Sequence, residues 1–425
     1  MRIVNQNVTT AKLPHLPESD LCCGCGACVD TCSKEALSLR EDEDGFLDVW
    51  LDADKCVGCG LCERHCHLLN QSELKRSNPR EVKPVAGWST NEELIARSAS
   101  GGIFAQLAYD MLGIPDTYVY GAALLPDSSV RHIEIASRDQ LSTLQNSKYQ
   151  QSDTTGIYRQ VKRRLQEGAR VLFSGVPCQI AALHSYLGSN EALKERLYTL
   201  EVLCHGVPTG ELHRTALRLN GAKRIVSYRT KRNTGWIGNN NRLTYETEHG
   251  ELTPRRYVYD FLFRAYLQFS FTRPGCYQCR YGTMPRVADI TVGDFWGWQH
   301  SAESQRYRNY MGVSIVLPNT AKGQSMIYSS ASLHVEPVRW QDILPYNQNL
   351  FMPTNDYLFA GGRWVHHIRK MPLRVQKFIY QNGFSVRYVD ALWRCILSVL
   401  LFARNRRIKR EVRSRMQETL TSLER

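Results

Sequence analysis

Eight cysteines near the N-terminus repeat one spacing, C-x2-C-x2-C-x3-C, twice. The first copy is Cys22, Cys25, Cys28 and Cys32, and the second is Cys56, Cys59, Cys62 and Cys66. Three thiolates at this spacing wrap one face of a cubane iron–sulfur cluster, while the fourth cysteine of each copy ligates the other cluster. The spacing therefore predicts two 4Fe–4S clusters, with the ligand sets Cys22, Cys25, Cys28, Cys66 and Cys56, Cys59, Cys62, Cys32.

Zinc is the alternative metal for this block, because C-x2-C units also hold zinc. Zinc sites rarely repeat four cysteines at this spacing in tandem, so iron–sulfur is favoured. Four glycines keep the wrapping backbone free of Cβ atoms near the sulfides: Gly24, Gly26, Gly58 and Gly60. Cys23 falls outside the pattern and is interpreted as a spare thiol.

The block resembles bacterial two-cluster ferredoxins along its whole length. It differs where a proline usually follows the last cysteine of each motif, because Ser33 and His67 stand there instead. This difference bears on loop stiffness and redox tuning more than on ligation. Between the motifs, residues 40–56 are predicted to form a hairpin that turns at Asp44–Gly45.

Four later cysteines form a second group of interest. Cys178 and Cys204 follow two expected strands, 171–175 and 197–203, and Cys276 and Cys279 precede a third. Ligands of open α/β sheets bind outside the carboxyl ends of the strands, so the first two thiols face the same space. Each alone is more often a small buried hydrophobe, but together they complete a set for a third cluster or a structural zinc. Spacing alone leaves that choice open. Cys395 lies alone in an apolar segment and is expected to be buried in a core or at a membrane face.

The elements that position these cysteines divide the chain into three parts and a linker. We expect a ferredoxin-like module over 16–70, a linker over 71–83, an α/β domain over 84–345 and a basic helical region over 346–425. In the middle part, short apolar runs alternate with helical periods, which predicts a mostly parallel sheet with mixed strands added. The expected strands are 171–175, 197–203, 290–295 and 313–318, and the expected helices are 179–187, 210–219 and 320–331.

Composition sets the class of protein. A chain of 425 residues with 43% hydrophobic and 22% charged residues is typical of a globular protein with more than one domain. No run approaches the roughly 18 apolar residues needed to span a bilayer. The first twenty residues lack the apolar core of a secretory signal, which predicts a cytoplasmic protein. In that compartment, 14 cysteines indicate metal or redox chemistry rather than disulfides.

The net charge of +13 resides mainly in the C-terminal tail. Residues 363–425 contain 15 Lys and Arg against 4 Asp and Glu. An apolar run, 386–403, is followed by a basic run ending at Arg415, a pattern typical of a peripheral anchor on anionic lipid at the inner face of the membrane. The alternatives are a solvated helix covering the domain and a docking surface for an acidic partner. Nucleic acid is not expected, because the rest of the chain is nearly neutral.

Six separated motifs, in the same order, resemble the beta subunits of coenzyme F-420 hydrogenases and dehydrogenases over about residues 18–320. They are the ferredoxin start and the segments ARSASGGIFAQLA, NSKYQQSD, VLFSGVPCQIAAL, EVLCHGVP and CYQCRYGTMPRVADITVGDFWGW. The resemblance implies an iron–sulfur flavoprotein that binds FAD in the α/β domain beside a 4Fe–4S cluster. In archaeal members, the flavin exchanges hydride with the deazaflavin coenzyme. Other relatives reduce hydroxymethyl-chlorophyll, and many bacterial ones lie near cell-surface polysaccharide genes.

The resemblance also assigns roles to residues by motif. Iron–sulfur is favoured over zinc for the third set, Cys178, Cys204, Cys276 and Cys279. Flavin contacts are implied for the small residues Ser98, Ser100, Gly101 and Gly102, for Lys148 and Tyr149, and for Asp294 and Trp296. The alternatives are an ordinary helix N-cap for the small residues and a buried strand end for Asp294 and Trp296. No G-x-G-x-x-G follows a strand, so direct nicotinamide binding has no motif support.

Two functional hypotheses follow. The first is an oxidoreductase in which FAD exchanges hydride with deazaflavin or another small organic substrate, and the clusters pass electrons to or from a ferredoxin-type partner. The second is a non-catalytic subunit that relays electrons to a partner protein at the membrane surface. A zinc-stabilised binding module is a weaker third reading. An open flavin face with its own substrate pocket distinguishes the first from the second.

Overall fold

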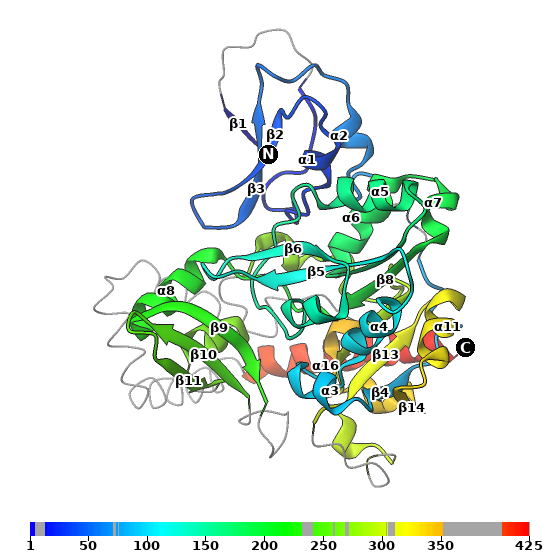
Figure 1. Ribbon diagram of the computed structural model, residues 1–425. Helices are drawn as coiled ribbons and strands as arrows, with labels where there is room; N and C mark the ends of the chain where they lie inside the picture. The colour runs from blue at the N-terminus through cyan, green and yellow to red at the C-terminus, as the bar shows by residue number, and fades with distance from the viewer. Residues whose placement is uncertain are drawn as a thin grey trace.

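The computed structural model describes residues 1–4, 13–70, 74, 76–231, 241–257, 260–267, 272–302, 304, 311–351 and 402–424. These residues form an N-terminal cysteine-rich module, a large α/β body and a smaller antiparallel sheet beside it (Figure 1). Cys395 and most of the apolar run 386–403 lie outside the described residues.

The N-terminal module is built on the sheet β1-β3-β2. Its strands are β1 (Arg2–Val4), β2 (Leu37–Glu41) and β3 (Leu47–Asp52), and its short helices are α1 (Ala27–Thr31) and α2 (Leu61–Arg64). The antiparallel pairing of β2 with β3 confirms the predicted hairpin. In its turn, one carboxylate oxygen of Asp42 accepts the backbone N–H groups of Asp44 and Phe46 at 2.9 Å. β1 pairs in parallel with β3, so the sheet includes residues that precede the expected module.

The body is a sheet of eight strands in the order β14-β4-β13-β12-β8-β7-β5-β6. Their bounds are β4 (Val85–Ser89), β5 (Thr117–Leu124), β6 (Val130–Ile135), β7 (Arg170–Gly175), β8 (Leu197–Val202), β12 (Ile290–Asp294), β13 (Ser314–Pro318) and β14 (Leu333–Pro337). β7, β8, β12 and β13 confirm the four predicted strands.

The sheet is mixed, as the predicted α/β domain with added mixed strands has it, but fewer of its strand pairings are parallel than expected. The central strands β5, β7, β8 and β12 are parallel, but the pairings at both edges are antiparallel. The edge strand β6 shows why, since its sequence VRHIEI mixes apolar and polar residues along the strand. That pattern is typical of antiparallel strands, which can expose one face, whereas buried parallel strands are apolar throughout.

Helices cover both faces of this sheet (Figure 1). Along β7, Val171 and Phe173 pack with α5 and α6, while Leu172 packs on the opposite face with α4. This alternation follows from the two-residue period of a strand. The helices are α3 (Glu92–Arg97), α4 (Ile103–Met111), α5 (Ile157–Gln166), α6 (Pro177–Leu187), α7 (Glu191–Glu195), α11 (Ala321–Ser329) and α12 (Trp340–Ile343), with short 3-10 turns at Arg138–Thr143, Trp298–His300 and Gln348–Leu350.

A third sheet was not expected from the sequence. It contains β9 (Ala222–Thr230), β10 (Arg242–Thr247) and β11 (Leu252–Arg256), all antiparallel. The helices α8 (Gly210–Asn220) and α9 (Phe261–Leu267) share a core with it, and α10 (Pro274–Tyr277) follows. This sheet brings the end of β9 to the edge of the main body, which matters for the site below.

The basic helix α16 (Phe402–Glu424) packs on the body. Val412, Met416, Leu420 and Leu423 join the cluster that contains Trp340. These apolar side chains of α16 therefore contact protein, as in the alternative of a helix covering the domain. Within the described part of the chain, no helix is long and apolar enough to cross a membrane.

Asp30 holds the N-terminal module against the body. Its buried carboxylate accepts the backbone N–H groups of Gly156 and Tyr158 at 2.6 and 2.9 Å, and that of Arg159 at 3.3 Å, at the start of α5. These amides have no partner within the helix, so Asp30 satisfies them from the neighbouring module. Burial raises the pKa of Asp30, although the same hydrogen bonds oppose that shift.

Replacing Asp30 with alanine is expected to lower the free energy of unfolding by about 1–3 kcal/mol, because the amides at the start of α5 lose their acceptor. Urea denaturation measures the change. Asp30→Asn keeps one side-chain oxygen and should lose less. An Asp30→Ala protein as stable as the wild type would show that water replaces this contact.

Candidate functional site

The structure brings the repeated cysteines together across the two motifs. Cys28 lies close enough to Cys22 and Cys66 to interact electrostatically with both, and Cys62 interacts in the same way with Cys32. The fourth cysteine of each motif thus lies near a cysteine of the other motif, as two-cluster wrapping requires. Four cysteines also line a cavity of about 200 Å³: Cys32, Cys56, Cys59 and Cys62.

The backbone around these cysteines uses left-handed glycines. Gly24, Gly26, Gly58 and Gly60 all have φ between 64° and 75°. At Gly24, a Cβ would also come within 2.6 Å of the carbonyl oxygen of Leu47, so no other residue fits. The glycines are needed for the turn itself, which adds to the reason predicted from the sequence.

Ionisation of these thiols is costly without a metal. Burial raises the pKa of Cys22 to about 12 and that of Cys62 to about 11, and neighbouring cysteines add to both shifts. Iron binds the thiolate form, so a cluster would remove that cost. The donor set therefore fits 4Fe–4S clusters.

The four later cysteines also converge, although they come from three separate segments. Cys178 lies in the first turn of α6, and Cys204 follows β8. Cys276 lies in α10, and Cys279 lies two residues after the end of that helix. Cys204 interacts with both Cys276 and Cys279, and Cys178 interacts with Cys204 and Cys279. Burial raises the pKa of Cys204 to about 11. The structure therefore brings these four thiols near one another around one space.

All four open onto a cavity of about 670 Å³. This volume lies within the roughly 300–1,000 Å³ of sites that hold small molecules and cofactors. Its walls come from the carboxyl ends of β7, β8 and β12, the start of α4, and the end of β9. This is the crevice expected outside the carboxyl ends of the strands, where ligands of such sheets bind. The cysteines line one part of the wall.

The predicted flavin residues lie on the wall of the same cavity, with one exception. Ser98, Ser100, Gly102, Lys148, Tyr149, Asp294 and Trp296 all line it. Gly101 stands behind the wall, where its N–H donates to Oγ of Ser314 at 3.0 Å and a Cβ would clash with the carbonyl oxygen of Gly87. Gly101 therefore serves the packing of the loop on β4 and β13.

The start of α4 presents backbone donors to the cavity. Gly102 is its N-cap at φ 79°, and no side chain caps the helix. The first N–H groups of a helix carry partial positive charge and bind phosphate readily. The hydroxyls of Ser98 and Ser100 are already engaged, because they donate to the carbonyl oxygens of Leu94 and Val313. The backbone of the loop fits an anion better than its hydroxyls do.

Lys148 and Tyr149 have partners of their own. Nζ of Lys148 donates to the carbonyl oxygens of Leu144 and Gln145 at 2.8 and 2.7 Å, and to that of Thr143 at 3.5 Å. Burial lowers the pKa of Lys148 to about 7. Tyr149 packs edge to face with Tyr228, Phe263 and Tyr266. A phosphate contact at Lys148 would require it to release one of these carbonyls.

Arg229 lies at the cavity wall with Asp294 and Trp296, and the sequence did not predict it as a site residue. Its side chain is 3% exposed, Nη1 lies 2.6 Å from a carboxylate oxygen of Asp294, and its guanidinium lies 6.0 Å from the ring of Trp296. The pair neutralises two buried charges at the cavity wall, which are stable there only together. Arg229 comes from the unpredicted third sheet, so no sequence motif indicated it.

His132 anchors a buried polar network beside the cysteines. One ring nitrogen contacts the carbonyl oxygen of Ser174 at 2.9 Å, and the other contacts the hydroxyl of Ser152 at 2.8 Å. The Gln179 amide donates to the same hydroxyl at 2.9 Å. Ser152 therefore donates to His132, which holds the ring neutral with its proton on Nε2. Burial lowers the pKa of His132 to about 4.

This shift predicts a pH effect on stability. The folded state resists protonation, so His132 costs stability as the pH falls from its ordinary pKa of 6.5 toward about 4. Between pH 7.5 and 5.5, wild type should lose about 1.4 kcal/mol more than His132→Gln. Denaturant unfolding of both proteins at the two pH values measures this. Equal losses would mean that the ring is protonated without penalty.

Comparisons with known proteins match two parts of the chain to families. Residues 21–68 match the 4Fe–4S dicluster domain, and residues 168–338 match the C terminus of the beta subunit of coenzyme F-420 hydrogenase/dehydrogenase. No curated protein matches. A chain in a structure of the F-420-reducing nickel–iron hydrogenase complex from Methanosarcina barkeri, derivatised with xenon, is similar at 17% identity and a TM-score of 0.41, covering 65% of this chain and 88% of that one.

Proposed function

We propose that this chain, an iron–sulfur electron-transfer protein related to the beta subunits of coenzyme F-420 hydrogenases and dehydrogenases, is an FAD-dependent oxidoreductase. The observation that carries the proposal is the shared cavity. A complete set of four thiols, an uncapped helix start and aromatic side chains line one space of about 670 Å³, and Cys23 of the dicluster module lines it too.

We assign the ligands by their convergence. Cys22, Cys25, Cys28 and Cys66 hold one 4Fe–4S cluster, and Cys56, Cys59, Cys62 and Cys32 hold the second. Cys178, Cys204, Cys276 and Cys279 hold a third. Soft thiolates suit iron–sulfur and zinc alike, and the cavity beside the third set favours a redox centre over a structural metal, because a structural site has no need of an adjoining ligand space.

We place the diphosphate of FAD at the start of α4. There the backbone N–H groups after Gly102 bind the anion, and the loop from Ser98 keeps its shape through its own hydroxyl bonds. Lys231 supports this loop, since its Nζ donates to the carbonyl oxygens of Ile95 and Ser100 at 2.9 and 2.6 Å. Trp296 and Tyr149 border the space for the ring system.

Bound FAD would supply hydride exchange with deazaflavin or another small organic substrate, and single-electron exchange with the clusters. The chain's residues bind, orient and exclude water. Arg229 and Asp294 place an ion pair without net charge at the wall. The hydrogen-bonded network of His132, Ser152 and Gln179 is uncharged and lies beside Cys178. The body that does this extends from β4 to β14, and we propose that its domain spans 84–345, after the module at 16–70 and the linker at 71–83.

The alternative is a subunit that relays electrons to a partner protein at the membrane through the region 346–425. The apolar residues of α16 pack in the core of the body, so they need no membrane to cover them. The large cavity favours the first reading, in which a small substrate reacts at the flavin. Cell-surface polysaccharide metabolism is one source of a small substrate. Turnover with reduced ferredoxin and deazaflavin, against turnover only with a partner protein, separates the two.

Anaerobic purification followed by assay of iron, acid-labile sulfide, zinc and flavin tests the proposal. We expect about twelve irons and one FAD per chain. Eight irons with one zinc would make the later cysteines a structural site. If flavin were also absent and none bound on addition, the cavity would not be a redox site.

A further inference from the structure

Lys231 directly follows β9 and reaches the loop that precedes α4. Its Nζ donates to the carbonyl oxygens of Ile95 and Ser100 at 2.9 and 2.6 Å, and also to that of Met311. An ammonium group has three N–H donors, so these three carbonyls use all of them. One side chain therefore joins three segments that lie far apart in the sequence.

The positive charge of Lys231 is poorly balanced within the protein. The carboxylate that acts on it is that of Asp294, which is already paired with Arg229 at 2.6 Å. Burial lowers the pKa of Lys231 to about 7, and the charge of Arg229 adds to this shift while Asp294 opposes it. A neutral donor could satisfy the carbonyls, and withdrawing a cation from water is costly. The choice of a lysine therefore favours an anion near this place.

The other segments around Lys231, as far as the structure describes them, bring little charge of their own. On α3, Glu93 and Arg97 pair with each other at 2.9 Å, and both are exposed. Residues 98–102 and 311–313 contain no charged side chain. The charged groups that act on the titration of Lys231 are therefore Arg229 on β9 and Asp294 on β12.

The loop before α4 is also held by neutral contacts. Gly312 packs so closely that a Cβ there would lie 2.6 Å from the carbonyl oxygen of Ser100. On the other side, the Gln145 amide donates to the carbonyl oxygen of Leu94 at 3.0 Å and to Oγ of Ser98 at 3.3 Å. The shape of the loop therefore does not by itself require a cation.

The loop leads directly to the start of α4, where the proposed function places a diphosphate. Ser100 precedes the N-cap Gly102 by two residues, so the hydrogen bond to Ser100 puts Lys231 within roughly 13 Å of that N-cap. At this range in a protein interior, one unit charge changes the binding of another by about tenfold. The charge of Lys231 can therefore act on an anion at α4 without touching it.

We propose that Lys231 is a positioning residue whose positive charge balances the diphosphate of FAD, so that its protonated form is needed for tight cofactor binding. This inference rests on the proposed FAD site. The bound anion favours the charged form of Lys231, so the pKa is higher in the complex than in the free protein. Binding therefore takes up a proton near neutral pH, and the affinity falls as the pH rises through the free-state pKa of about 7.

Isothermal titration with FAD tests this in the full-length protein, with its clusters intact and its flavin removed. Titrations at pH 7.5 in two buffers of different ionisation enthalpy give the number of protons taken up. If the charge strengthens binding about tenfold, wild type should take up about half a proton more than Lys231→Gln. Between pH 6 and pH 9, the affinity of wild type should fall by about tenfold more than that of the variant.

Matched variants separate this role from a structural one. Lys231→Arg is always charged, so it should bind FAD tightly at both pH values without the extra proton uptake. Nζ of Lys322 also donates to backbone carbonyls, those of Lys194 and Leu197 at 2.8 and 2.7 Å, but at the end of β8 opposite the cavity. Lys322→Gln should therefore lower the free energy of unfolding and keep the proton uptake of wild type.

Riboflavin separates the diphosphate from the ring system, because it contains the same ring and no phosphate. Its binding should show no difference in proton uptake between wild type and Lys231→Gln, and an equal difference with riboflavin would overturn the proposal. Full proton uptake in Lys231→Gln, or in Lys231→Arg if the first variant does not fold, would overturn it and leave the FAD site in place. If wild type bound no FAD, the proposed function and this inference would both fail.

Discussion

Cys204→Ser is expected to lower the iron content from about twelve to about eight atoms per chain, because a hard hydroxyl is a poor substitute for thiolate in an iron–sulfur site. The remaining iron should stay in the N-terminal module, whose cysteines come from residues 22–66 alone. Reduction of bound flavin by ferredoxin should fall at least about a hundredfold, since the cluster beside the cavity is missing. Iron and sulfide assays and stopped-flow flavin absorbance measure the two effects.

The matched control for Cys204→Ser is Cys59→Ser. Cys59 is exposed and lines the smaller cavity with Cys32, so this variant should lose iron from the opposite end of the module and leave the third set intact. The two variants should therefore have the same iron content but different resonance spectra. A Cys204→Ser protein that keeps twelve irons would remove Cys204 from the ligand set.

The second large effect concerns the buried ion pair behind the third set. Arg286 and Glu201 are 1% and 0% exposed at their side chains and are joined through Nε and Oε1. Arg286→Met would leave Glu201 charged and buried, with the hydroxyl of Thr291 donating to it at 2.8 Å. Removing one partner of such a pair costs about 3–5 kcal/mol. Denaturant unfolding of the purified variant should show a loss of that size.

The double variant Arg286→Met, Glu201→Leu tests the cause. Replacing both charges with apolar side chains removes the unpaired carboxylate, so most of the lost stability should return. Arg286 also donates to the carbonyl oxygen of Tyr281 at 2.8 Å, and that part of the loss should remain. If the double variant were no more stable than the single one, packing rather than charge would account for the effect.

Local patterns in the sequence predicted the elements that carry most of the site. The strands before Cys178 and Cys204 are continuous apolar runs, typical of buried parallel strands, and both thiols follow them as expected. The hairpin at Asp44–Gly45 has a strong turn signal and was also predicted. Family motifs then indicated most of the residues that line the cavity.

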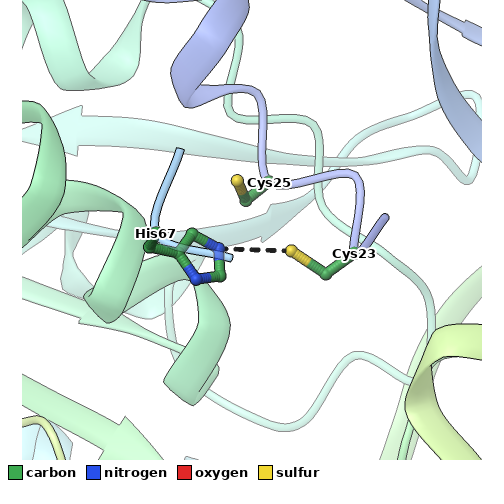
Figure 2. Close-up of side chains that lie close together, drawn as sticks. All are labelled: Cys23, Cys25 and His67. Atoms are coloured by element: carbon green, nitrogen blue, oxygen red, sulfur yellow. Dashed lines mark hydrogen bonds between the residues drawn. The ribbon is translucent and has the colours of Figure 1, made fainter. Parts of the chain in front are cut away.

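The remaining features depend on contacts between distant segments. Nothing local in β9 to β11 distinguishes them, and Arg229 reads as one more charged residue until the fold buries it against Asp294. Likewise, Cys23 and His67 are 44 residues apart, and their contact (Figure 2) depends on how the module folds back on itself. A single sequence holds no pattern for such contacts.

The origin of the cysteines also bears on how the protein matures. The two sets of the module come from one short stretch, Cys22 to Cys66, so that stretch can accept iron soon after it leaves the ribosome. The third set draws on α6, the end of β8 and the turn at α10, which meet only when the central sheet is complete. If the third set holds the cluster we propose, its loading comes last, and a chain delayed in folding would accumulate with only the two clusters of the module.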